Sequence, residues 1–247
     1  MEEKNNFSVI ITALVIVIIV AFVVSYFKAK NYHPEDTLVL DETYELKDII
    51  IKSNAANINI KNTDEEIIKV KIYGDESRTT VEDYDKLSIE SNIKTFKFLS
   101  FNKAATIEIY LPKDYDNKIK IEDDYGNLTI DSFIDSTFDI ELDAGKVKMK
   151  EVSNLKLDVN AADVEISKIN KKFDIEVDAG NVEIGEIDIE EDSSIEIDAG
   201  NVEIGKTNKI AIDTETDVVE VKINNNYSDS KVHLNISMDI GNISIDN

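Results

Sequence analysis

The chain has 247 residues, of which 42% are hydrophobic, and it carries a net charge of −24 at pH 7. The apolar content excludes overall disorder, and the absence of cysteine excludes disulfides, thiolate metal sites and cysteine catalysis. With only His33 and His233, a multi-histidine metal site is not expected. The acidity argues against nucleic acid as a partner. It either attracts cations or a basic partner or, in the favoured interpretation, keeps an extended β surface soluble.

The first predicted element is a membrane helix. Residues 7–27 read FSVIITALVIVIIVAFVVSYF without a single charge, and a helix of that length spans about 31 Å, the thickness of a hydrocarbon core. The competing interpretation is a cleavable signal peptide, which has a shorter apolar region and a small-residue cleavage site. Residues 25–32, SYFKAKNY, offer no convincing site, which favours an uncleaved anchor.

The predicted organisation is a short N-terminal tail (residues 1–6), a transmembrane helix (7–27), a juxtamembrane stalk (28–37) and a β-solenoid domain (38–247). The flanking charges leave the orientation open. Lys4 and the terminal amine precede the helix, and Lys28 and Lys30 follow it, a small bias towards keeping the large domain inside. Large domains are translocated regardless of such small differences.

An internal repeat organises the rest of the chain. The octet DAGNVEIG occurs at residues 178–185 and again, 20 residues later, at 198–205. Looser copies lie at residues 54–60, 124–130, 143–149, 160–166, 215–221 and 239–245. Self-similarity at a period of about 20 residues is typical of a solenoid. The sequence therefore predicts an all-β, β-helix or β-solenoid-like stack of units of about 17–20 residues, preceded by one N-terminal transmembrane α-helix.

Each unit has the same internal pattern. In residues 173–179, Phe173, Ile175 and Val177 alternate with Asp174 and Glu176, which places the apolar side chains on one face of a strand. An Ala-Gly-Asn turn follows, in which glycine supplies a positive φ, and residues 182–189 form a second alternating strand. One unit cannot bury its apolar face alone, whereas stacked units bury a continuous core.

Stacking predicts a polar ladder along one edge, because equivalent residues of adjacent units lie about 4.8 Å apart. Its expected members are Asp143, Asn160, Asp178, Asp198, Glu215 and Asp239. Such a row either attracts a divalent cation or is repeated turn chemistry that faces water. The chain lacks the glycine-rich nonapeptide of calcium-loaded β-rolls and an EF-hand loop. The sequence therefore singles out no metal-ligating residue, and cation binding by the ladder stays open.

The segment before the repeats is β-rich but less regular. Alternation predicts strands at residues 65–74, 86–91 and 105–112. Residues 95–101, TFKFLSF, are either an exposed binding patch or a cap on the open end of the solenoid core, and the second interpretation is favoured. Later in the chain, Ser193 is expected on a surface turn.

The chain resembles the bacterial putative-adhesin domain family, whose members are uncharacterised and often membrane-anchored envelope proteins. The resemblance rests on ATIEIYLPKDYDNKIKIEDDYGNLTI at residues 105–130, on the repeated units after it and on NAANINI at residues 54–60. It implies a β-helix-like fold, a bacterial cell membrane location and a large domain on the extracellular side. It brings no catalytic residues. Many relatives carry Ser or Thr beside the repeat glycine, where this chain has Ala or Asp.

Three functional classes remain. The favoured one is a non-catalytic, membrane-anchored interaction module of the cell envelope, adhesin-like or an envelope-stress accessory protein, with a protein or glycan partner and no small-molecule substrate. A cytoplasm-facing scaffold that self-assembles is the alternative. A carbohydrate-active enzyme is less favoured, because the chain has no Trp, its only Arg is Arg78, and no nucleophile or phosphate-loop motif is present. The sequence assigns no catalytic, cofactor-binding or metal residue, and no cofactor.

Overall fold

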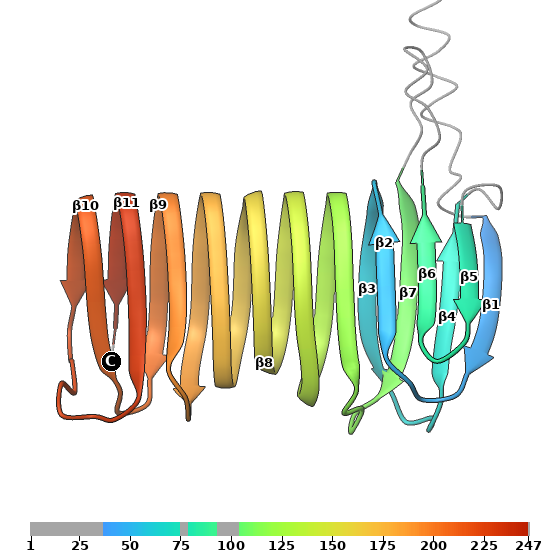
Figure 1. Cartoon of the computed structure of the whole chain (residues 1–247), viewed down its shortest axis with the longest axis horizontal. Helices are drawn as coiled ribbons and strands as arrows, with labels where there is room; N and C mark the ends of the chain where they lie inside the picture. The colour runs from blue at the N-terminus through green and yellow to red at the C-terminus, as the bar shows by residue number, and fades with distance from the viewer. Residues whose placement is uncertain (1–36, 75–78, 93–103, 247) are drawn as a thin grey trace, which may run out of the picture.

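The computed structural model describes residues 37–74, 79–92 and 104–246, which form an 11-stranded sheet wound into a solenoid (Figure 1). The strands are β1 (Leu38–Tyr44), β2 (Ile49–Ser53), β3 (Ala56–Thr63), β4 (Ile68–Tyr73), β5 (Thr79–Asp83), β6 (Leu87–Ser91), β7 (Ala105–Pro112), β8 (Lys118–Ile189), β9 (Ser193–Thr207), β10 (Ala211–Ile223) and β11 (His233–Ile245). The predicted all-β, solenoid-like stack is therefore confirmed for this part of the chain.

The predicted transmembrane helix at residues 7–27 lies outside the described residues, as does the aromatic segment 95–101. Within residues 37–74, 79–92 and 104–246, no helix is long and apolar enough to cross a membrane.

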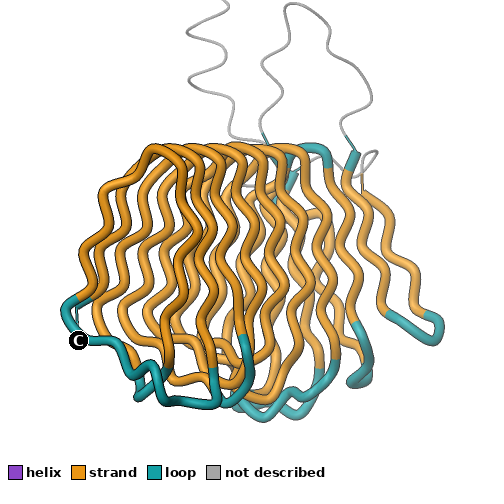
Figure 2. The backbone as a smooth tube through the Cα atoms, turned by 60° about the vertical axis from the view of Figure 1, so that its left-hand side comes forward, coloured by secondary structure: helices purple, strands orange, loops and turns teal. Residues whose placement is uncertain are grey.

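The long strand β8 is the body of the solenoid. It winds through successive rungs whose corners, Gly126, Gly145, Ala162 and Gly180, lie directly against one another. The next rung, β9, pairs in parallel with the end of β8, with Gly180 opposite Gly200. The predicted Ala-Gly-Asn turn is a corner inside a continuous strand (Figure 2). Gly145 and Gly180 bend there with φ of 153° and 158°, which a residue with a Cβ rarely adopts.

The interior is built from columns of aliphatic side chains that run along the stack. Phe173, Ile175 and Val177 are at most 1% exposed, while Asp174 and Glu176 face solvent, so the predicted alternation is confirmed. Equivalent positions of the following rungs align, as in Ile175 with Ile195. Each fully buried Val, Ile or Phe stabilises the fold by roughly 1.5–3 kcal/mol as an upper estimate, which explains why consecutive rungs hold one register.

The N-terminal end departs from chain order. The rung formed by β2 and β3 lies between β8 on one side and β6 with β7 on the other, all in parallel. Ala56 lies opposite Gly126, so the copy at residues 54–60 is a true rung. Outside it the sheet turns antiparallel, with β4 and β1 beyond β7 and β5 beyond β6. The three strands predicted by alternation are confirmed as β4, β6 and β7.

The C-terminal end also departs from chain order. Strand β11 lies between β9 and β10, so the last strand in the sequence is the penultimate rung in space (Figure 1). The reason lies in the inward-facing residues. In β11 these include Leu234, Ile236 and Met238, all buried, whereas the opposite positions in β10 include Thr214 and Thr216, which are exposed. The rung with hydroxyls in its inward positions therefore stands at the end, where one side faces water.

Candidate functional site

The strand that leads into each corner carries two outward columns of mostly acidic residues. The first, which we call the acidic column, takes the residue four positions before each corner: Glu122, Glu141, Asp158, Glu176, Glu196, Ser237 and Glu215. The second, the corner column, takes the residue two positions before it: Asp124, Asp143, Asn160, Asp178, Asp198, Asp239 and Asp217. The two columns make one anionic face along the stack.

The corner column corrects the predicted ladder. Asp143, Asn160, Asp178, Asp198 and Asp239 belong to it as expected, and the Asn160 Nδ2 donates to the Asp143 Oδ1 at 3.0 Å. Its terminal member is Asp217 instead of Glu215, because Val218 pairs with Ile240 and Thr216 with Met238. Glu215 lies two residues earlier, in the acidic column.

Like charges on adjacent rungs raise the pKa of Glu176. The largest cause is repulsion by Asp158, followed by partial burial and by repulsion from Glu196, Asp174 and Asp178. The carboxylates are therefore close enough for their charges to repel one another. Among the described residues, however, no three acidic or histidine side chains converge into a group that could hold a metal ion.

A ladder of amides lies on the other side of the corner, one residue after it. The Nδ2 of Asn181 donates to Asp163 Oδ1 at 2.9 Å, Asn201 donates to Asn181 at 2.7 Å, and Asn242 donates to Asn201 at 2.8 Å. At the other end of the stack, Asn127 donates to Asn57 at 3.0 Å. Each amide satisfies its neighbour along the solenoid axis, so this column fixes the register of the rungs instead of offering free groups to a ligand.

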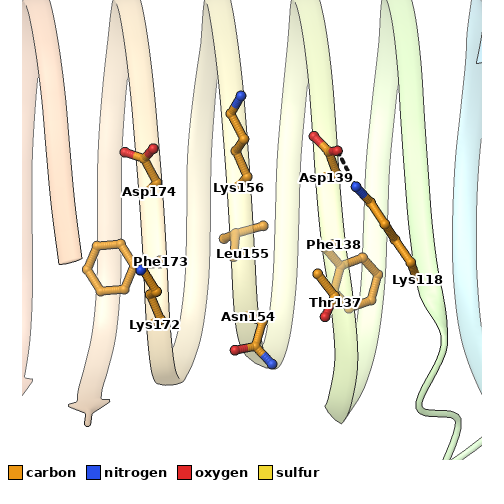
Figure 3. A pocket seen from close by; sticks show the side chains of 10 residues that line it. All are labelled: Lys118, Thr137, Phe138, Asp139, Asn154, Leu155, Lys156, Lys172, Phe173 and Asp174. Carbon is orange, nitrogen blue, oxygen red and sulfur yellow. Dashed lines mark hydrogen bonds and ion pairs between the residues drawn. The ribbon is translucent and has the colours of Figure 1, made fainter. Parts of the chain in front are cut away.

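A hollow of about 290 Å³ lies near the start of four successive rungs (Figure 3). Three lysines surround it, Lys118, Lys156 and Lys172. Lys118 pairs with Asp139 at 2.6 Å, whereas Lys156 makes no ion pair with any described residue. The wall includes Phe138 and Phe173, which are at most 1% exposed. Their rings therefore belong to the core and offer a ligand no stacking surface.

The sequence prediction missed one residue, Asp123. Its rung position, three before the corner, holds buried Leu142, Val177 or Ile197 in other rungs, but Asp123 is only 6% exposed. Burial raises the pKa of Asp123 to about 7, although hydrogen bonds from Ser53 and from the backbone of Ala56 and Tyr125 oppose the shift. Its Oδ1 has no hydrogen-bond partner. The detectable signal was an acid in the apolar position of the repeat.

The expected exposure of Ser193 is wrong. Ser193 is 3% exposed, its hydroxyl accepts from the backbone N–H of Phe173 at 3.1 Å, and it donates to the Glu191 carbonyl at 3.1 Å. The surface turn lies just before it, at residues whose side chains are exposed.

These features define an acidic β-solenoid with parallel rungs, antiparallel strands at its N-terminal end and a periodic polar exterior. The family model described as Toastrack DUF4097 matches residues 46–247, and the chain belongs to that family. This family match confirms the family resemblance drawn from the sequence. None of the curated proteins matches the chain.

Three similar solved structures illustrate the likeness. A putative adhesin from Bacteroides fragilis is 14% identical over 85% of this chain and 98% of its own, with a TM-score of 0.43. A putative adhesin from Parabacteroides distasonis is 14% identical over 85% and 98%, with a TM-score of 0.45. A putative cell adhesion protein from Clostridium sporogenes is 18% identical over 84% and 98%, with a TM-score of 0.33.

Proposed function

We propose that the chain is a non-catalytic interaction module of a bacterial cell envelope, anchored by residues 7–27 and presenting its solenoid outside the cell to a protein or glycan partner. The observation that carries the proposal is the anionic face. From the rung of Gly126 to β10, the acidic and corner columns place at least one carboxylate on each rung of a stack whose register the core and the amide ladder hold fixed. A rigid, periodic surface of this kind suits recognition of an extended partner.

The distribution of carboxylates supports a binding role over catalysis. Glycoside hydrolysis uses two carboxyl groups that face each other across a cleft, one of them with a raised pKa. The strongly raised pKa here belongs to Asp123, which is buried beneath a corner. The carboxylates of the acidic and corner columns stand side by side on an outer face.

The scaffold alternative is disfavoured by the charge at the ends of the stack. Self-assembly end to end would bring β10, with Asp213, Glu215, Asp217 and Glu220, against another acidic rung. Like charges directly opposite one another destabilise strand pairing, and a contact between two chains lacks the chain connection that holds like-charged neighbours together within the stack.

Membrane sidedness tests the proposal. Because the chain has no cysteine, a Ser228→Cys variant carries a single thiol at an exposed loop position, and an Asn5→Cys variant marks the predicted N-terminal tail. Intact cells that express each full-length variant are treated with a membrane-impermeant maleimide. We expect labelling of the Ser228→Cys chain in intact cells and of the Asn5→Cys chain only after lysis. The reverse pattern would refute an extracellular solenoid and leave the cytoplasmic scaffold.

A further inference from the structure

The outer edge of β10 is an open strand edge. Among the described residues, β10 pairs only with β11, over the register from Ala211 with His233 to Ile223 with Ile245. In Figure 1 it is the end strand of the stack. Its other edge therefore presents backbone N–H and C=O groups that a further strand can pair with.

The chain itself closes only the beginning of this edge. The Asn226 side chain imitates a neighbouring strand, since its Oδ1 accepts from the Ile212 N–H at 3.0 Å and its Nδ2 donates to the Ile212 carbonyl at 2.8 Å. The Tyr227 N–H donates to the Ile210 carbonyl at 3.2 Å. Ile210 and Ile212 are accordingly buried, whereas every residue from Asp213 to Val218 is exposed. The part of the edge that the chain covers therefore ends at Ile212, directly before the first carboxylate, Asp213.

The open part of the edge has a distinct chemistry. Asp213, Glu215 and Asp217 alternate on one face, and Glu220 follows beyond the corner. Lys222 is the one cationic residue of β10, and Asp213 also lies 2.7 Å from the Nδ1 of His233 in the adjacent rung. A strand added beside β10 would place its own side chains about 4.8 Å from these carboxylates. Lys or Arg at alternate positions would be attracted there, and Asp or Glu would be repelled.

An exposed apolar pair lies at the corner of the same edge. Val218 is 71% exposed and Ile240, its partner in the adjacent rung, is 59% exposed. In the middle rungs the equivalent position is Ala, as at Ala179 and Ala199. The terminal corner therefore offers an aliphatic contact that the body of the stack does not.

We propose that the outer edge of β10, from Asp213 to Ile223, binds an extended basic segment of another protein, which adds one rung through main-chain hydrogen bonds. The segment would carry Lys or Arg at alternate positions opposite Asp213, Glu215 and Asp217 and a small aliphatic residue at the corner beside Val218. Strand addition of this type takes its affinity from the main chain and its specificity from alternate side chains. The inference rests on the proposed function and names the chemistry of the partner.

Charge selects this occupant over a second copy of the chain. A second β10 would set carboxylate against carboxylate, and the opposite end of the stack is no better suited. Its edge strands β1 and β5 carry Asp41 and Glu42, and Glu82 and Asp83, respectively. A copy of this chain thus has only acidic described edges to offer.

The experiment measures binding of a fluorescent 12-residue peptide, in which Lys alternates with Thr and Val, to the full chain in detergent micelles by anisotropy. Two further probes share its length: one with Glu in place of Lys, and one with alternate backbone nitrogens methylated. We expect the Lys peptide to bind and the Glu peptide to bind at least about tenfold more weakly. Methylation should abolish binding, because it removes the donors that pair with β10. A methylated peptide that binds equally well would overturn strand addition.

Matched charge reversals locate the site. The double variant Glu215→Lys/Asp217→Lys reverses both outer columns at β10, and the control Glu176→Lys/Asp178→Lys makes the same change in mid-stack. We expect the β10 variant to weaken Lys-peptide binding about tenfold or more and the control about twofold or less. Equal losses would show attraction to the whole anionic face and overturn an edge site.

Sedimentation of the full chain without peptide completes the test. Assembly that the β10 variant alters and the control does not would overturn the proposal in favour of a second copy; a single species supports it. None of these assays depends on sidedness, so the failure of the inference and the failure of the proposed function are distinguishable.

Discussion

A Cβ atom on Gly200 would lie 1.6 Å from the carbonyl oxygen of Gly180 in the rung beside it. The same relationship recurs along the stack: a Cβ on Gly145 would lie 1.7 Å from the Gly126 oxygen, and one on Gly241 would lie 1.7 Å from the Gly200 oxygen. Real Cβ atoms do not approach closer than about 3 Å, because the atoms overlap. The glycines of the repeat thus let one corner nest against the next.

Replacement of Gly200 by Ala should lower the free energy of unfolding by about 1–3 kcal/mol, because the backbone must shift to relieve the overlap. The measurement is the urea midpoint of the full chain in detergent. Ala162→Gly, in the same column, is the control and should cost less than about 1 kcal/mol, the backbone-entropy term of a glycine. An unchanged midpoint for Gly200→Ala would mean that this corner can adopt the backbone that Ala162 already has.

Two isoleucines of one inner column allow a mid-stack position to be compared with the terminal rung. Ile184 pairs with Ile204, which pairs with Ile245, which pairs with Ile223 in β10. Ile184 is fully buried and Ile223 is half-buried. Ile184→Ala should cost about 2–5 kcal/mol of unfolding free energy, and Ile223→Ala less than about half of that. Equal losses in urea denaturation would contradict the position of β10 as the terminal rung.

Much of the fold follows from local sequence chemistry. The octet at residues 178–185 predicted the inward residues, the corner glycine and the stacking, because each of these depends only on alternation and on the identity of a repeated residue. Residues such as Ile175 and Asp174 lie on the faces that alternation assigned to them.

The order of the rungs at each end did not follow from the sequence, because similar copies compete for the same neighbours. Residues 215–221 and 239–245 both resemble the repeat, and chain order alone places them in sequence. The decisive feature is Thr214 and Thr216 in inward positions, since a rung with hydroxyls there is stable only beside solvent. The inward position of Asp123 did not follow either, because this residue precedes the copy at residues 124–130 and only the folded rung places it against the core.

Repulsion between Glu176 and the neighbouring carboxylates should have a measurable effect on stability, because it raises the pKa of Glu176. A carboxyl with a raised pKa in the folded chain contributes stability at low pH that is lost as the pH rises and the group ionises. Glu176→Gln should therefore raise the free energy of unfolding at pH 7 and low salt, by no more than about 0.5 kcal/mol for an exposed site. This gain in unfolding free energy should shrink at roughly 0.5 M salt, because screening weakens the repulsion.

Glu165 is the matched control for that prediction. It pairs with Lys148 at 2.5 Å and with Lys146 at 3.4 Å, and these ammonium groups lower the pKa of its carboxyl. Glu165→Gln should therefore change stability in the opposite direction at low salt. If both glutamine variants shifted the urea midpoint in the same direction, repulsion along the acidic column would not explain the Glu176 effect.

Asp123 gives the chain a pH dependence with a defined sign. Its folded-state pKa is about 7 against an ordinary value of 3.8, so the folded chain keeps a proton there that the unfolded chain has lost. The neutral form stabilises the fold fully below about pH 4, and this stability declines as the pH rises to about 7, by at most about 1.4 kcal/mol per pH unit. Asp123→Asn stays neutral and should lack this slope. The difference between the urea midpoints of the two chains, followed from pH 4 to pH 8, isolates Asp123 from the other carboxylates. A difference that does not vary with pH would show that water reaches the Asp123 carboxylate and that its pKa is ordinary.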